Sequence, residues 1–129
     1  MSEISVPVSP GELLDKVTIL RIKSQRMSDA AKLANVRIEL KVLEETWAAS
    51  AYAKVDISAD VAALLEVNER LWVIEDDIRD CERAQDFGAR FIELARAVYH
   101  TNDKRAALKR ALNEALGSAI VEEKSYKPY

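Results

Sequence analysis

Apolar side chains recur every three or four residues over most of the chain, and this spacing predicts α-helices. From Pro10 to about Met27 they cover more than one narrow stripe, so we expect this helix to pack on more than one side. A second helix is predicted from Ser28 or Asp29 to beyond Trp47, and its apolar positions form one seam: Leu33, Val36, Leu40, Leu43 and Trp47. Because the connection is short, the two helices are expected to form an antiparallel hairpin.

Two further stretches show the same periodicity. The first follows a cap at Ser58 or Asp60 and runs to about Gln85. The second follows the break "QDFGARF", in which Gly88 is a weak helix position and Asp86 can act as a cap.

A fifth helix is expected to follow a polar corner in "YHTNDKRAALKR" and to end at Gly117, a favoured residue type just past a helix. Its start would lie at Thr101 or Asn102, which are capping residue types. Lys104 and Arg105 would then lie in the first turn, where the helix dipole disfavours cations. Either acidic groups of the chain neutralise these cations, or the cations help to bind an external anion.

Strand signals are almost absent, so the predicted fold class is all-α. We expect an antiparallel bundle of about five helices forming one domain over residues 1–129. Ahead of the capping signal "SPGE", the stretch "ISVPV" predicts a short extended N-terminal arm. The C-terminal stretch "SAIVEEKSYKPY" has no helical periodicity and predicts an irregular tail.

Composition narrows the range of binding partners and cellular compartments. The net charge of -3 argues against non-specific nucleic-acid binding, which needs a basic surface. Cys81 is the only cysteine, so no internal disulfide can form, and a reducing compartment is favoured. The start of the chain carries no secretory signal pattern, and no apolar run is long enough to span a bilayer. We therefore expect a cytoplasmic protein without membrane insertion.

Few kinds of catalytic site can be built from this chain. One histidine and one cysteine exclude the usual zinc sites and the di-iron sites of helical bundles. No glycine-rich phosphate loop or nucleophile elbow is present. We assign no catalytic residue, metal or cofactor, and we expect Cys81 to be a packed, inert thiol.

A structural polar network is predicted around the third helix. Asn68 and Glu75 lie on its apolar seam and need partners, so a basic residue of another helix is expected to reach Glu75. Arg79 is also four residues from Glu75, in the favourable order for an ion pair. From the tail, Glu122 and Glu123 can fold back to neutralise the corner.

The alternative for the corner is an anion site, in which cations and backbone N–H groups bind a phosphate or carboxylate. We favour neutralisation of the cations by acidic groups of the chain but keep both interpretations. The candidate anion-binding residues are Arg96, Tyr99, Asn102, Lys104, Arg105 and Lys109.

Three long motifs carry a resemblance: "GELLDKVTILRIK", "LWVIEDDIR" and "VYHTNDKRAALKR" followed by "VEEKSY". They resemble a family of small bacterial proteins catalogued as a domain of unknown function. The resemblance covers nearly the whole chain but implies no activity and no catalytic residue. Its members occur beside sugar-transfer and surface-polysaccharide genes, which implies a metabolic context for the alternative function below but no specific reaction.

The leading functional hypothesis is a non-catalytic helical module that self-associates, with a two-fold dimer as the default symmetry. The expected interface anchors are the aromatic residues Trp47, Tyr52, Trp72 and Tyr126. The alternative is a binder of, or an enzyme acting on, a small anionic metabolite such as a nucleotide sugar or sugar phosphate, with a link to surface-polysaccharide metabolism.

Overall fold

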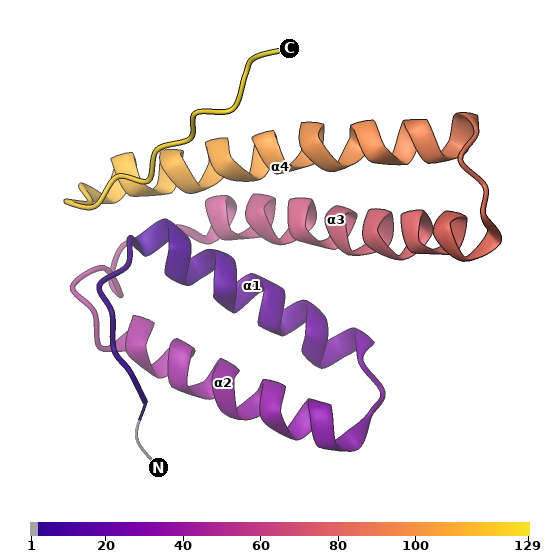
Figure 1. The fold of residues 1–129 in the computed structure, drawn as a ribbon. Helices are drawn as coiled ribbons and strands as arrows, with labels where there is room; N and C mark the ends of the chain where they lie inside the picture. Colours follow the sequence, from indigo (N-terminus) through magenta and orange to yellow (C-terminus); the bar gives the residue numbers. More distant parts are fainter. Residues whose placement is uncertain (1–2) are drawn as a thin grey trace.

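The computed structural model describes residues 3–129 and is all-helical, with four α-helices and no strand in that range. The helices form a bundle (Figure 1): α1 (Pro10–Arg26), α2 (Ala30–Ala48), α3 (Ser58–Ala84) and α4 (Ala89–Leu116). Within residues 3–129, no helix combines the length and the apolar character needed to cross a membrane.

Local signals at several helix ends behave as the sequence predicts. Ser9 caps α1: its Oγ accepts a hydrogen bond from the backbone N–H of Glu12 at 3.2 Å, and Pro10 occupies the first helical position. Asp29 caps α2 through the N–H of Lys32. At the far end, Gly117 follows α4 in the left-handed conformation, with φ of 66°.

The predicted corner between a fourth and a fifth helix is wrong, because α4 runs without a break from Ala89 to Leu116. The capping-type residues at this place are used in other ways. Thr101 is buried, Asn102 Oδ1 accepts from Arg105, and Asp103 accepts from residues of the tail. Each of these residue types costs a helix interior only about 0.5 kcal/mol, and neither glycine nor proline interrupts the segment.

The caps predicted for the next helices are also wrong. Ile57, which makes no side-chain cap, precedes α3, while the Asp56 side chain accepts bonds from Ser58. Gly88 occupies the cap position of α4, and Asp86 accepts from its N–H at 3.0 Å instead of capping the helix itself. The break at "QDFGARF" is confirmed as the turn between α3 and α4.

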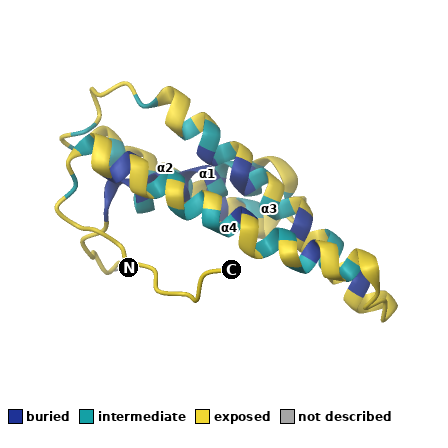
Figure 2. Ribbon diagram, turned by 90° about the horizontal axis from the view of Figure 1, so that it is seen from above, coloured by how far each residue is buried: buried dark blue, intermediate teal, exposed yellow. Residues whose placement is uncertain are grey.

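The four helices form two hairpins, α1–α2 and α3–α4, with α1 lying between α2 and the second hairpin (Figure 1). α1 packs on α2, α3 and α4, which confirms that it is covered on more than one side. Within the described residues, α2 packs along α1 alone. Figure 2 shows that both terminal segments are exposed. The extended conformation expected for the N-terminal arm stays a prediction.

Apolar packing is divided between two clusters. Leu14, Leu64 and Leu112 bring together α1, α3 and α4, and Trp47 of α2 packs against them. The second cluster belongs to α3 and α4 alone and contains Ile74, Cys81 and Leu94. Cys81 is therefore a buried, packed thiol, as predicted.

The first turn of α1 lies directly against the last turns of α4. The N–H of Gly11 donates to Asn113 Oδ1 at 2.7 Å in a buried hydrogen bond. A Cβ atom at residue 11 would lie 2.6 Å from the carbonyl oxygen of Lys109 and 2.8 Å from Asn113 Oδ1. Only glycine lets the two backbones approach this closely.

This close approach predicts that Gly11→Ala destabilises the protein by about 1–3 kcal/mol, although alanine is the better helix former. Urea denaturation followed by circular dichroism measures the change. Gly88→Ala is the matched control, because a Cβ there meets only the Asp86 side chain, at 3.2 Å, and we expect a change of about 0.5 kcal/mol or less. Equal stabilities of the two variants would contradict the packing of α1 on α4.

Candidate functional site

The centre of the molecule contains a buried carboxylate, that of Asp15 on α1. Only 1% of this residue is exposed. Its Oδ1 accepts hydrogen bonds from Arg105 Nε and from Asn68 Nδ2, both at 2.9 Å, and its Oδ2 pairs with Arg105 Nη2. One side chain of α1 is thus held by α3 and α4 together.

Thr18, one turn further along α1, completes this buried group. Its hydroxyl accepts the second N–H of the Asn68 amide at 2.9 Å and donates to the backbone carbonyl of Asp15 at 2.8 Å. In the described residues, no buried side-chain nitrogen or oxygen lacks a hydrogen-bond partner. This result is what a stable polar core requires.

Lys109 adds a second cation one turn after Arg105. Its ammonium group pairs with Glu12 and lies 3.7 Å from Asp15 Oδ2 and 3.5 Å from Glu122 Oε2. Only 12% of the lysine side chain is exposed. Lys109 therefore links two acids of α1 to one acid of the C-terminal tail, residues 118–129.

These contacts shift the pKa values of the group. Burial alone would raise the pKa of Asp15, but hydrogen bonds from Arg105 and Asn68 and the charges of Arg105 and Lys109 outweigh it, so the pKa lies below its ordinary value. The pKa of Arg105 is raised, first by its hydrogen bonds to Asp15. For Lys109, burial would lower the pKa, yet the bond to Glu12 and the neighbouring acids raise it.

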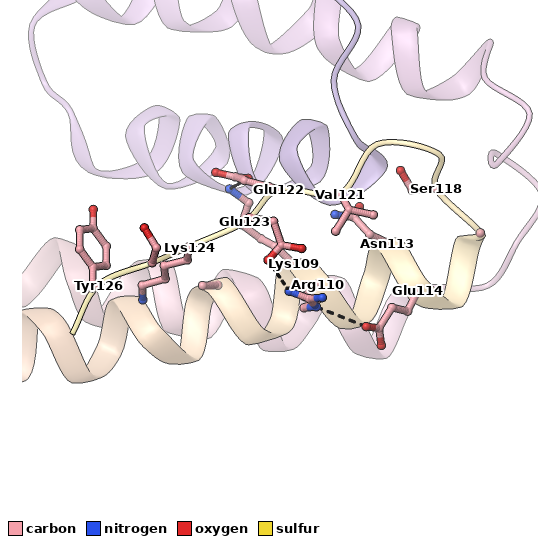
Figure 3. A pocket seen from close by; sticks show the side chains of 13 residues that line it. Lys109, Arg110, Asn113, Glu114, Ser118, Val121, Glu122, Glu123, Lys124 and Tyr126 are labelled. Carbon is pink, nitrogen blue, oxygen red and sulfur yellow. Dashed lines mark hydrogen bonds and ion pairs between the residues drawn. The ribbon is translucent and has the colours of Figure 1, made fainter. Parts of the chain in front are cut away.

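The tail runs back along α4 from Gly117, as Figure 3 shows for residues 121–126, and encloses a cleft of about 630 Å³ against the helix. Polar side chains make its contacts with α4. Arg110 lies 3.4 Å from Glu123 Oε2, and Asp103 pairs with Lys124 and accepts a hydrogen bond from Tyr129.

Aromatic contacts hold the end of the tail. The Tyr129 ring lies 5.1 Å from the Tyr99 ring and 4.8 Å from the His100 ring. The hydrogen bond to Asp103 raises the pKa of Tyr129 to about 12, and the same bond, after that from Lys124, lowers the pKa of Asp103. The charged side chains in these contacts are between 36% and 73% exposed, and exposed pairs contribute little each, so the tail is held weakly.

Four of the six candidate anion-binding residues line one cleft of about 550 Å³ beside the tail: Tyr99, Asn102, Arg105 and Lys109. The other two, Arg96 and Lys104, are exposed and do not line it. The structure also shows that the two cations do not lie in the first turn of a helix. Lys104 and Arg105 lie in the middle of α4, far from either pole.

The residues predicted to form a structural network fall into three separate places. Asn68 belongs to the buried group around Asp15. Glu122 and Glu123 lie beside Lys109 and Arg110, one turn beyond the pair they were expected to neutralise.

The prediction that a basic residue of another helix reaches Glu75 is wrong. Glu75 is exposed and pairs with Arg79 on its own helix. Asn68 and Glu75 share one face of α3. α1 contacts that face at Leu64 and Asn68, and it diverges from α3 toward the other end (Figure 1).

Charge balance limits what this site can do chemically. Arg105 is paired with Asp15, Lys109 with Glu12, and Arg110 with Glu114 at 3.4 Å, all before the tail is considered. The two glutamates of the tail then add negative charge to a balanced cluster. The arrangement is therefore built to join helices, and its cations have internal partners.

Sequence reasoning missed Asp15 and Glu12, the two acids of α1. A signal for Asp15 was present, because it lies between Leu14 and Val17 in a helix expected to be packed on several sides. An acid in such a helix must find a cation. The cation itself, 90 positions later in the chain, could not be identified from spacing.

The buried pair makes stability depend on pH. The pKa of Asp15 is lower in the folded than in the unfolded state, so its contribution is present above the unfolded value and is lost as pH falls through the folded one. We predict that Asp15→Asn costs about 2–4 kcal/mol at pH 7, because Arg105 loses its carboxylate partner. We also expect a flatter stability profile for this variant between about pH 5 and pH 2.

Urea denaturation at several pH values measures both effects. Asp80→Asn, on an exposed part of α3, is the control and should keep the profile of the native chain. Parallel profiles for Asp15→Asn and the native chain would show that Asp15 is not the linked group.

Comparisons of the chain with protein-family models, with curated proteins and with solved structures give no match. The resemblance to a family of bacterial proteins of unknown function therefore stays a prediction.

Proposed function

We propose that the chain is a non-catalytic helical module that self-associates as a two-fold dimer. One observation carries the proposal: α2 packs along α1 alone, yet it is apolar on more than the side that faces α1. Such a helix leaves apolar surface for a second copy of the chain.

The outward side of α2 is an apolar stripe. Ile38 is 65% exposed, Val42 is exposed one turn later, and small side chains continue the same face toward the start of the helix. Their spacing of three and four residues places them on one side of the helix. The stripe consists of Ala31, Ala34, Ile38 and Val42.

A groove lies on the other side of α2. It has a volume of about 570 Å³ and is bounded by α2, by α3 and by the loop before α3, with α1 as its floor. Leu14 and Val17 form part of that floor, and Trp47, Val61 and Leu65 line the sides. The apolar lining supports association with an apolar partner segment.

The aromatic anchors expected from the sequence are a weaker basis for an interface. Trp47 and Tyr52 stack on each other at 6.1 Å and are half-buried, as is Trp72. Tyr126 is the exposed member, on the tail. Aliphatic side chains of α2 therefore replace aromatic ones as the proposed contact. The single cysteine supports a reducing compartment such as the cytoplasm for this module.

The full chain is predicted to form dimers at micromolar concentration, and dilution should dissociate them. Sedimentation velocity over the range from about 1 to 200 µM measures the dimer fraction. A chain that stays monomeric at about 200 µM would refute self-association as its function.

A second candidate function is binding of a small anionic metabolite, and one observation favours it. Tyr99, Asn102, Arg105 and Lys109 line one cleft, from which Glu122 could be displaced at little cost, since its side chain is mostly exposed. Charge balance is against this candidate, because Arg105 and Lys109 already have acid partners on α1.

This candidate predicts that inorganic phosphate or a nucleotide sugar raises the melting temperature, and raises it more in Glu122→Gln. Thermal denaturation with and without each ligand measures the shift. Asn102→Ala in the Glu122→Gln background should abolish it, whereas Lys41→Gln on α2 should not. The same shift in all variants would mean that binding occurs elsewhere.

A further inference from the structure

We propose that the groove between α2 and α3 binds the N-terminal segment, residues 3–8, of a second copy of the chain, with the two copies exchanging segments. The proposal rests on the proposed self-association and names its interface. Residues 3–8 lie outside any helix or strand and are exposed along their length (Figure 2).

The groove is apolar inside and charged at one edge. Leu14 and Val17 are buried beneath it, while Val55 at its border is exposed. The groove's charged lining residues are Arg21 and Glu44, which pair with each other at 3.1 Å, and Asp56. The lining is made of helices and one loop, so the groove offers side-chain surface and no strand edge for a partner to pair with.

The segment has the chemistry that fits this lining. Ile4 is 92% exposed and Val6 is 66% exposed, and Val8 is exposed as well. A spacing of two places all three side chains on one side of an extended chain. Pro7, between the two valines, has no N–H to donate, so this segment is suited to docking by its side chains rather than by a backbone ladder.

The length of the segment agrees with this occupant. From Ile4 to Val8 an extended chain covers about 13 Å, and the groove follows α1 from Leu14 to Arg21, about 10.5 Å of helix.

The buried area is also sufficient for a weak dimer. Each aliphatic side chain removes about 60–120 Å² from water on full burial. Two exchanged segments, with the groove surface they cover, bury on the order of 1,000 Å², the lower limit for a specific interface. We therefore expect a dimer in the micromolar range.

A second copy is the occupant because the chain's own segment does not occupy the groove. Ile4 is almost fully exposed, and the segment is fixed where it meets α1, since Ser9 is buried and caps that helix. Exchange between two copies gives each groove a segment and closes the assembly at two chains.

The test uses the full chain and sedimentation velocity. The double variant Ile4→Asp with Val6→Asp should raise the dimer dissociation constant at least about tenfold and leave the melting temperature unchanged, because both side chains are exposed. Val55→Asp, on the groove side, should do the same. Ile92→Asp on α4 is the matched control and should keep the native dissociation constant, because Ile92 is exposed and lies outside both the groove and α2.

Complementation provides a second readout. Each variant alone should dimerise more weakly than an equimolar mixture of the Val55→Asp chain and the double variant. In the mixture, heterodimers should form because one native segment then meets one native groove. Trp47 lines the groove, so its fluorescence should shift to shorter wavelength as dimers form.

Three outcomes would overturn the proposal. If the double variant keeps the native dissociation constant, residues 3–8 are not part of the interface, although self-association itself would stand. Loss of the dimer in Ile38→Asp alone would place the interface on the outer stripe of α2. A native chain that is monomeric at about 200 µM would refute self-association together with the exchange.

Discussion

The structure depends on one constraint, the need to satisfy a carboxylate buried at the centre of the bundle. Asp15 is 1% exposed, and an unpaired charge there would be prohibitive. Its partners come from two other helices, Arg105 from α4 and Asn68 from α3. A buried ion pair adds little net stability compared with apolar packing, but it admits few alternative geometries. We infer that its main effect is to fix the register of three helices.

The same constraint explains why α4 is continuous. Arg105, Lys109 and Asn113 succeed one another at intervals of four residues and face the first two turns of α1. A corner between residues 99 and 105 would turn part of this row away from α1. Local sequence signals favour a break there, and the tertiary contacts of the whole row outweigh them.

Features that depend on neighbouring residues could be predicted from the sequence, and features that depend on distant residues could not. Ser9 and Gly117 act within one turn of the chain, and their roles could be predicted from neighbouring residues. The fold class followed from periodicity. The partner of Asp15 and the exposure of Glu75 depend on where α1 approaches α3 and where it diverges. That path is set by packing across the bundle, so no local pattern contains it.

The divergence of α1 from the α3–α4 hairpin has a consequence for how the molecule opens. Beyond the buried group, the cluster of Ile74, Cys81 and Leu94 belongs to two helices only, whereas the other end is covered by three or four. Two paired helices protect their backbone amides less well than a full bundle does. Fluctuations should therefore start at the turn between α3 and α4 and proceed inward until they meet Asp15 and Arg105. The hairpin would then fray as a unit while the rest of the bundle stays folded, and the buried ion pair would mark the boundary between the two regions.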